Sequence, residues 1–268
     1  MAEPLIDLRV FAGGAELARA AAEEFTRRAG EAIRARERCA VALSGGSTPR
    51  RLFALLADPA QPFRDRIEWR AVHFFWGDER HVPPDHPESN FRMARETLLD
   101  AVPVPAENVH RIRGEEPDAA RAAALYEDEL RTFFSGALYA PRAPRFDLVL
   151  LGLGADAHTA SLFPGSEAVR ERERWVVAPW VETLRSFRIT LTPAVFNRAA
   201  AVIFLVQGEE KAGALRAVFE VEQRELERRE VERDPDRWPA QVIRPESGEV
   251  LWLVDRAAAS SLNDRSRS

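Results

Sequence analysis

Cysteine and lysine are almost missing from this chain, which contains a single residue of each type, Cys39 and Lys211. One cysteine excludes a disulfide within the chain, so a reducing compartment such as the cytoplasm is expected. The first ten residues, MAEPLIDLRV, include two acidic side chains and no long apolar run, which does not fit a signal peptide. No apolar stretch approaches the roughly 20 residues needed to cross a bilayer, so no membrane partner is expected.

A surplus of positive charge is also lacking, because the formal net charge of the 268 residues is −5. This balance argues against a nucleic-acid partner but leaves room for a small local anion site. Without internal repeats or long linkers, the sequence predicts one α/β domain over residues 1–260 and a flexible tail over 261–268. The charge-alternating stretch 220–237 is expected to form a solvated helix. Both a monomer and a small homo-oligomer remain open.

What the sequence does contain is an alternation of short apolar runs with amphipathic helical patterns. Near-continuous apolar runs of about four to eight residues are typical of strands buried on both faces of a parallel sheet. Helical patterns cover residues 15–36 and 118–134, where apolar residues recur at helical spacing. The alternation predicts a single doubly wound, open and mostly parallel sheet flanked by helices. The predicted strands are CAVAL (39–43), AVHFFW (71–76), FDLVLL (146–151), RITLT (188–192), AVIFLV (201–206) and VLWLV (250–254).

Ligands of open α/β sheets bind beyond the carboxyl ends of the strands, so the loops that follow the strands matter most. After the first predicted strand comes SGGSTPRR, in which Thr48 is expected to cap a helix that starts at Pro49. The glycines, hydroxyls and free N–H groups there would form an anion cradle, with an ordinary capped turn as the alternative. The loop lacks the lysine of a nucleotide P-loop, so ATP is not indicated. The candidate anion-binding residues are Gly45, Gly46, Ser47 and Thr48, with Ser44 as a weaker candidate.

A polar loop, GDERHVPPDHPESN, follows the second predicted strand. Arg80 is its strongest candidate, because a guanidinium binds phosphate through two parallel hydrogen bonds. Ser89 is expected to cap the next helix. Four other charged or titratable residues of this loop are interpreted as surface groups that pair with their neighbours: Asp78, Glu79, His81 and His86.

The loop after residues 146–151, GLGADAHTASLFPGS, contains Asp156 and His158 two residues apart, behind Gly152 and Gly154. In an extended stretch both side chains would point the same way. A carboxylate that orients an imidazole raises its basicity, which indicates a general acid–base pair. A structural histidine is the alternative. The glycines do not form a dinucleotide fingerprint, since no third glycine follows in register.

Lys211 lies in QGEEKAGAL, after the predicted strand 201–206, in the first turn of a helix expected to begin near Glu209. The helix dipole disfavours a cation there by about 0.3–1 kcal/mol, and a bound anion would reverse that penalty. A compact ammonium also fits a narrow phosphate pocket better than a planar guanidinium does. The alternative is a surface lysine that pairs with Glu209 or Glu210.

Five motifs, taken in order and spacing, resemble the 6-phosphogluconolactonase family: SGGSTP, FFWGDERHVPPDHPESN, GLGADAHTASLFPGS, RITLTP and VLWLVDRAAA. The resemblance covers residues 10–260 or so. It implies an α/β fold of the glucosamine-phosphate isomerase type. It also implies hydrolysis of 6-phospho-D-glucono-1,5-lactone in the oxidative pentose phosphate pathway, with a phosphorylated sugar lactone as partner and no metal or organic cofactor.

With this resemblance, His158 is expected to act as the general base and Asp156 to orient it. Lys211, Arg80 and the turn 45–48 are expected to hold the 6-phosphate. The family has glycine where this chain has Ala157, and a left-handed backbone there would strain alanine by roughly 1–2 kcal/mol. Weaker candidates for substrate binding are Ser44, Gly152, Gly154, Arg185 and Arg188.

Two alternative functions remain open. Glucosamine-6-phosphate deaminases resemble this chain in fold and in the acid–histidine motif. They carry Phe-Asn-Glu-Pro where this chain has SLFP (161–164), so the untitratable Phe163 stands in place of their acid. A non-catalytic sugar-phosphate sensor would usually carry a DNA-binding helix-turn-helix, for which the chain has no spare segment of about 60 residues.

Overall fold

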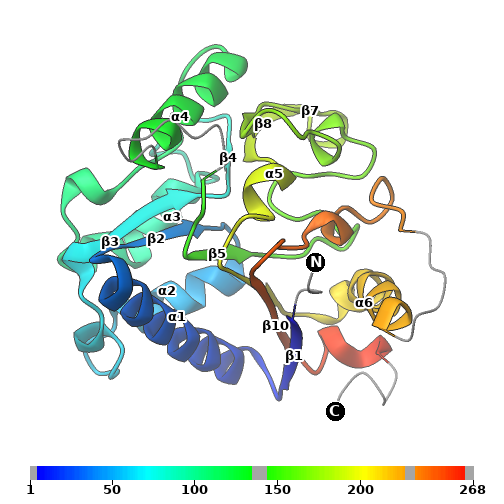
Figure 1. Cartoon of the computed structure of the whole chain (residues 1–268), viewed down its shortest axis with the longest axis horizontal. Helices are drawn as coiled ribbons and strands as arrows, with labels where there is room; N and C mark the ends of the chain where they lie inside the picture. The colour runs from blue at the N-terminus through cyan, green and yellow to red at the C-terminus, as the bar shows by residue number, and fades with distance from the viewer. Residues whose placement is uncertain (1–4, 135–143, 227–232, 263–268) are drawn as a thin grey trace.

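The computed structural model describes residues 5–134, 144–226 and 233–262 (Figure 1). Within these ranges ten strands form two sheets. Their bounds are β1 Leu5–Phe11, β2 Cys39–Leu43, β3 Val72–Trp76, β4 Asp78–Arg80, β5 Leu148–Leu151, β6 Val176–Val177, β7 Trp180–Val181, β8 Ser186–Leu191, β9 Ala201–Val206 and β10 Glu249–Asp255. Six of them build a wholly parallel sheet in the order β1-β10-β9-β5-β2-β3. The smaller sheet is antiparallel, with β8 between β4 and β6 and with β7 also paired to β8.

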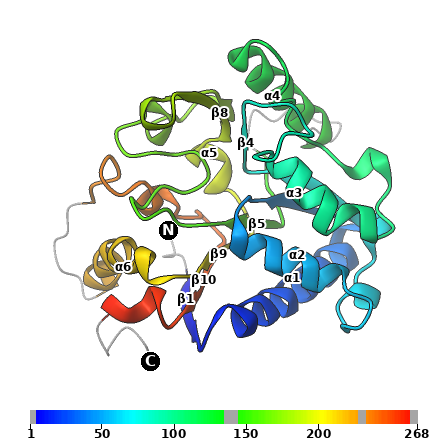
Figure 2. The same ribbon diagram turned by 180° about the vertical axis from the view of Figure 1, so that it is seen from behind.

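The helices cover both faces of the parallel sheet. They are α1 Gly14–Arg36, α2 Ser47–Ala57, α3 Asn90–Thr97, α4 Ala119–Phe134, α5 Pro193–Phe196 and α6 Ala212–Leu226. Figure 1 shows α1 and α2 on one side of the sheet and α6 on the other, and Figure 2 shows the same layers from behind. This arrangement confirms the predicted doubly wound, mostly parallel sheet. None of the described helices is both long and apolar enough to cross a membrane.

Burial explains why the strands read as continuous apolar runs. Every residue of β2, β5 and β9 is buried, because helices cover both faces of these central strands. The apolar stripe of α1 packs onto the sheet through Leu17, Ala21, Phe25 and Ala29, as its spacing predicts. These residues belong to one continuous hydrophobic core. The single-domain organisation itself stays a prediction.

Two strand assignments differ from the sequence prediction. RITLT was expected to join the parallel sheet, but β8 pairs antiparallel with β4 and β6 in the smaller sheet. A short apolar run does not reveal its pairing partner, which is why this prediction was wrong. The edge strand β1 was not predicted at all. Charged residues interrupt the apolar run of this strand. Asp7 and Arg9 form a partly exposed ion pair at the open edge of the sheet, so β1 lacks the continuous apolar pattern of a buried strand.

The two peripheral segments are described only in part. A 3₁₀ helix covers Ala258–Ser261 and Leu262 is buried, so the prediction of a flexible tail was wrong for residues 261–262. Residues 263–268 lie outside the described residues. Of the charged stretch 220–237, α6 covers the part up to Leu226, and residues 227–232 are likewise outside the described residues.

The strand order sets the place for a ligand. β2 and β5 are neighbours in the parallel sheet. The next strand of this sheet after β2 in the chain is β3, on the far side of β2, whereas the next one after β5 is β9, on the far side of β5. A crevice forms outside the carboxyl ends of neighbouring strands whose connections diverge in this way. The loops after β2 and β5 therefore face a common opening.

Candidate active site

A cavity of about 280 Å³ lies at the carboxyl ends of β2, β5 and β9, and we call it the strand-end cavity. It is lined by Ser44, Gly45, Gly46, Ser47, Thr48, Pro49, Asp78, Arg80, Asn90, Gly152, Leu153, Gly154, His158, Thr159, Ala160, Leu205, Gln207, Glu210 and Lys211. All the residues predicted to bind phosphate are present, and so is the predicted general base. Three predicted site residues do not line it: Asp156, Arg185 and Arg188.

The loop after β2 presents uncapped N–H groups to this cavity. Gly46 is the N-cap of α2 and has a φ of 106°, which only glycine adopts readily. The predicted cap at Thr48 was wrong, because this glycine turn lets the helix begin earlier, at Ser47. No side chain of the described residues caps α2, so its first N–H groups are left for a ligand. The hydroxyl of Ser44 is buried and has no hydrogen-bond partner among the described residues.

Asp78 and Asn90 are site residues that the sequence interpretation missed. Asp78 is 7% exposed, although it was interpreted as a surface charge. It accepts a hydrogen bond from Ser161 Oγ at 2.6 Å and another from Asn90 Nδ2 at 3.3 Å. A Cβ on Gly45 would lie 1.8 Å from Asn90 Oδ1, so only glycine fits against this amide. The position of Asp78 directly after β3 was the signal that could have identified it.

Glu79 was also wrongly interpreted as a surface charge. Its carboxylate is buried and accepts hydrogen bonds from the Ser89 hydroxyl and from the backbone N–H groups of Arg80, Asn90 and Phe91. Burial raises its pKa even though these donors favour the ionised form. Ser89 caps α3 as predicted, accepting from Arg92 N at 3.1 Å. The buried network therefore anchors the start of α3 and with it Asn90.

The loop after β5 brings Asp156 and His158 together. Asp156 Oδ1 lies 2.6 Å from His158 Nδ1 and accepts the backbone N–H of His158 at 3.1 Å. A carboxylate can only accept, so Nδ1 carries the proton and Nε2 keeps a free lone pair. Burial alone would raise the pKa of Asp156, but the hydrogen bonds from His158 outweigh it and hold that pKa below its usual value.

The backbone that creates this pair is a tight turn, so the two side chains do not meet through the alternation of an extended stretch. Gly154 N donates to His158 O at 2.8 Å, and Ala157 N donates to Gly154 O at 3.0 Å. Ala157 has a φ of 62°, the left-handed conformation that strains alanine. A Cβ on Gly154 would lie 2.1 Å from His158 Nδ1, so glycine is required beneath the ring. Phe163 stacks on the His158 ring, with ring centroids 4.4 Å apart.

Lys211 ends a 3₁₀ helix, Glu209–Lys211, and α6 follows directly. The helix expected near Glu209 thus begins with a 3₁₀ turn. The Lys211 side chain is 23% exposed, and its Nζ lies 3.9 Å from Glu210 Oε1, a loose ion pair. A surface pair of this kind contributes little, so the ammonium remains available to an anion in the strand-end cavity.

Of the three candidate arginines, only Arg80 lines the strand-end cavity. Its side chain donates to the carbonyl of Glu88. Arg188 is its direct partner across the β4–β8 pair, and two like charges so placed repel each other. Burial, followed by the charge of Arg80, lowers the pKa of Arg188. Arg185 is exposed at the end of a 3₁₀ helix, outside the lining of the cavity.

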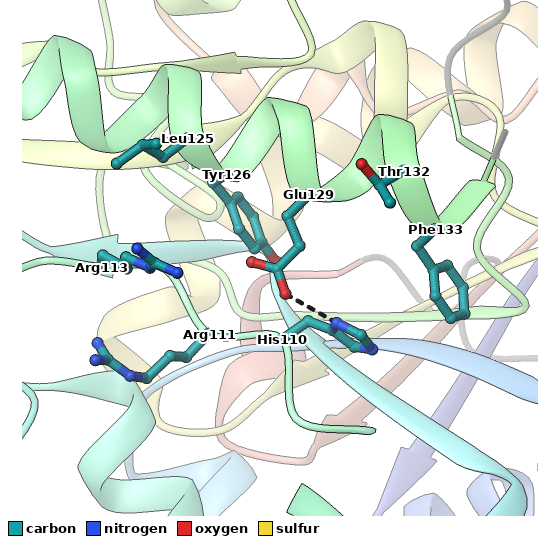
Figure 3. Close-up of a pocket in the computed structure, with 8 residues that line it drawn as sticks. All are labelled: His110, Arg111, Arg113, Leu125, Tyr126, Glu129, Thr132 and Phe133. Carbon is teal, nitrogen blue, oxygen red and sulfur yellow. Dashed lines mark hydrogen bonds and ion pairs between the residues drawn. The ribbon is translucent and has the colours of Figure 1, made fainter. Parts of the chain in front are cut away.

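A second, larger cavity of about 410 Å³ lies between α4 and the chain that follows Val109 (Figure 3). There Glu129 points toward His110, with Oε1 2.9 Å from Nδ1, and His110 Nε2 lies 3.2 Å from His73 Nδ1. Burial, then the charges of His110 and Arg38, lowers the pKa of His73 to about 4. None of the predicted site residues lines this cavity. Among the described residues, no group of three His, Cys, Asp or Glu is placed to hold a metal.

Known proteins resemble this chain over most of its length. A family model described as glucosamine-6-phosphate isomerases/6-phosphogluconolactonase matches residues 13–252. The 6-phosphogluconolactonase of Nostoc sp. is 42% identical over 232 residues, which cover 87% of this chain and 88% of the relative. That of Synechocystis sp. is 42% identical over 237 residues, covering 88% and 90%.

Solved structures extend the likeness to three dimensions. A 6-phosphogluconolactonase from Trypanosoma cruzi has a TM-score of 0.80 at 31% identity and covers 98% of each chain. A monomeric glucosamine-6-phosphate deaminase has a TM-score of 0.73 at 16% identity, covering 95% of this chain and 99% of its own, and shares the fold alone.

Fold and cavity together define an α/β protein that presents an imidazole, His158, and two cationic side chains, Arg80 and Lys211, to one crevice at the strand ends. The chain belongs to the glucosamine-6-phosphate isomerase/6-phosphogluconolactonase family. The resemblance noted in the sequence is therefore confirmed.

Proposed function

We propose that this protein is an enzyme that hydrolyses 6-phospho-D-glucono-1,5-lactone to 6-phosphogluconate in the oxidative pentose phosphate pathway. The single observation that carries the proposal is that His158 and Lys211 line the same strand-end cavity. One group supplies a base and the other a cation, and a phosphorylated lactone needs both. The lactonases among the relatives support the choice of substrate. The single cysteine, Cys39, is free and cannot form a disulfide within the chain, so the cytoplasm stays the predicted compartment.

In the proposed mechanism His158 Nε2 takes a proton from a water molecule as that water attacks the C1 carbonyl of the lactone. The tetrahedral intermediate then breaks its bond between C1 and the ring oxygen. The imidazolium returns the proton to the departing ring oxygen, so one water is consumed and the acid is released. Asp156 holds the ring by its hydrogen bond to Nδ1 and stabilises the transient positive charge.

The oxyanion needs donors that are not already engaged. Gly154 N–H is committed to the carbonyl of His158 and Ala157 N–H to that of Gly154, so neither is free to serve. The uncapped N–H groups at the start of α2 and the unpaired Ser44 hydroxyl remain. We assign the oxyanion or the neighbouring sugar hydroxyls to this turn, because a buried donor without a partner is costly unless a ligand or water satisfies it.

The 6-phosphate is assigned to Lys211 and Arg80, with help from the turn 45–48. Arg188 stands beside Arg80 without lining the cavity, and an anion bound at Arg80 would relieve the repulsion between the two guanidiniums. Binding the phosphate away from the reacting carbon holds the lactone in place against His158.

The main alternative function is that of a glucosamine-6-phosphate deaminase, and Phe163 argues against it because it stands in place of the acid of those enzymes. This ring stacks on His158 and has no proton to give for opening a sugar ring. A direct assay separates the candidates: freshly prepared 6-phosphogluconolactone is added and acid release is followed against spontaneous hydrolysis. We expect rapid hydrolysis by the wild-type protein, loss in His158→Gln, and no ammonia from glucosamine 6-phosphate. Ammonia release, or acid release at the spontaneous rate, would refute the proposal.

A further inference from the structure

The turn that carries the acid–base pair is held in an unfavourable conformation. Ala157 is fully buried and left-handed, at a φ of 62°, and strain of this kind persists only where the surroundings enforce it. One enforcing contact comes from far along the chain: the carbonyl of Ala157 accepts a hydrogen bond from Ala240 N at 3.0 Å.

Ala240 belongs to residues 234–242, a segment that we call the brace. The brace contacts the loop after β5 at a second point, where Gly165 N donates to Asp236 O at 2.8 Å. The carboxylate of Asp236 also forms an ion pair with Arg170. The brace is therefore hydrogen-bonded to the loop after β5 at two points, one before and one after His158 in the sequence.

Gln241 connects this brace to the rest of the molecule. Its side chain is 2% exposed, which is unusual for a glutamine unless its amide is hydrogen-bonded. Oε1 accepts from Asp234 N at 2.9 Å, which closes the brace on itself. Nε2 donates to the carbonyl of Ala217 at 3.2 Å, which ties the brace to α6. Because α6 begins directly after Lys211, the Gln241 side chain connects the brace to the helix that follows Lys211.

We propose that Gln241 is a positioning residue, which sets the orientation of His158 by holding the brace between α6 and the carbonyl of Ala157. Gln241 does not line the strand-end cavity, so its effect passes through Ala240 and the turn. The inference rests on the proposed lactonase activity. A displacement of about 1 Å at a reacting group lowers turnover by about a hundredfold. Loss of the two amide hydrogen bonds is therefore expected to lower kcat by about 10- to 100-fold, with KM within about threefold.

The test compares Gln241→Met, which keeps the length of the side chain without its hydrogen bonds, with Gln241→Ala, which also removes the packing. Asn108→Ala is the matched control. Asn108 is 5% exposed and its Nδ2 also donates to two carbonyls, Arg70 O at 2.9 Å and Val72 O at 3.2 Å, away from the catalytic turn. A selective loss of kcat in both Gln241 variants, measured below their Tm, supports the inference. Normal kcat in Gln241→Met, or an equal loss in Asn108→Ala, overturns it.

A second readout does not depend on activity. The chain has five histidines, and the ring-proton signal of His158 can be followed by NMR as a function of pH, with His158→Gln giving its assignment. We expect the titration of His158 to shift in Gln241→Met and to stay unchanged in Asn108→Ala. An unchanged His158 titration in Gln241→Met refutes the positioning role. Inactive wild-type protein refutes the lactonase proposal instead, so the two failures are distinguishable.

Discussion

Lys211 offers the sharpest test of how the strand-end cavity recognises its substrate. We expect Lys211→Ala to raise KM for 6-phosphogluconolactone by about 10- to 100-fold and to leave kcat within about threefold. A hydrogen bond to a charged group contributes about 1.5–3 kcal/mol, and each 1.4 kcal/mol or so is tenfold in affinity. The upper end is reduced because the side chain is 23% exposed and solvent screens its charge.

The assay measures initial rates over a range of substrate concentrations for two lactones, with and without the 6-phosphate. Arg216→Ala is the matched control, since Arg216 is an exposed cation on α6, the helix directly after Lys211. Its Nε lies 3.5 Å from Glu220 Oε1, and it does not line the strand-end cavity. Lys211→Arg keeps the charge but widens the head group, so its KM should fall between those of the wild type and Lys211→Ala. An equal rise in KM for the unphosphorylated lactone would show that Lys211 does not read the phosphate.

Three further predictions concern the base, the strained turn and acid stability. His158→Gln should lower kcat by about 10²- to 10⁴-fold with little change in KM, and near-normal turnover would remove the base assignment. Ala157→Gly relieves roughly 1–2 kcal/mol of strain but loses about 0.8 kcal/mol for a buried methyl group and about 0.5–1 kcal/mol for the flexibility of glycine. Its Tm should therefore stay within about 3 °C of the wild type, and a much larger fall in calorimetry would contradict the balance. Burial above all lowers the pKa of His73 from 6.5 to about 4, so the unfolded chain takes up a proton in this interval that the folded protein does not, and stability falls as the pH drops. His73→Phe should lose less Tm than the wild type over the same interval, and an equal loss would count against the buried imidazole as the cause.

The sequence was sufficient to predict which loops meet. Apolar runs such as 39–43 and 201–206 revealed buried parallel strands, and the carboxyl ends of parallel strands share one edge of a sheet. That rule placed Lys211 and His158 in loops at one edge of the sheet, and the family resemblance then assigned them to one predicted site. It holds because strand direction, and not detailed packing, decides which loops are neighbours.

Asp78 and Glu79 are residues whose burial could not be predicted from the sequence. Their sequence context, a polar loop after a strand, is also that of exposed charges. Both are buried because β4 leaves the parallel sheet and pairs with β8, and no local pattern encodes that partner. The same pairing placed Arg188 beside Arg80 and left Arg185 outside, although all three are arginines next to predicted strands.

The sequence by itself determined the chemical groups of the site and the edge of the sheet at which they gather, because residue type and the position of a loop directly after a strand are local properties of the chain. Only the tertiary structure decided how Asp156 and His158 are held together: a left-handed turn at Ala157, whose carbonyl accepts a hydrogen bond from Ala240, about 80 residues away in sequence. A strained turn is stable only when distant parts of the chain pack against it, and that packing exists only in the folded molecule.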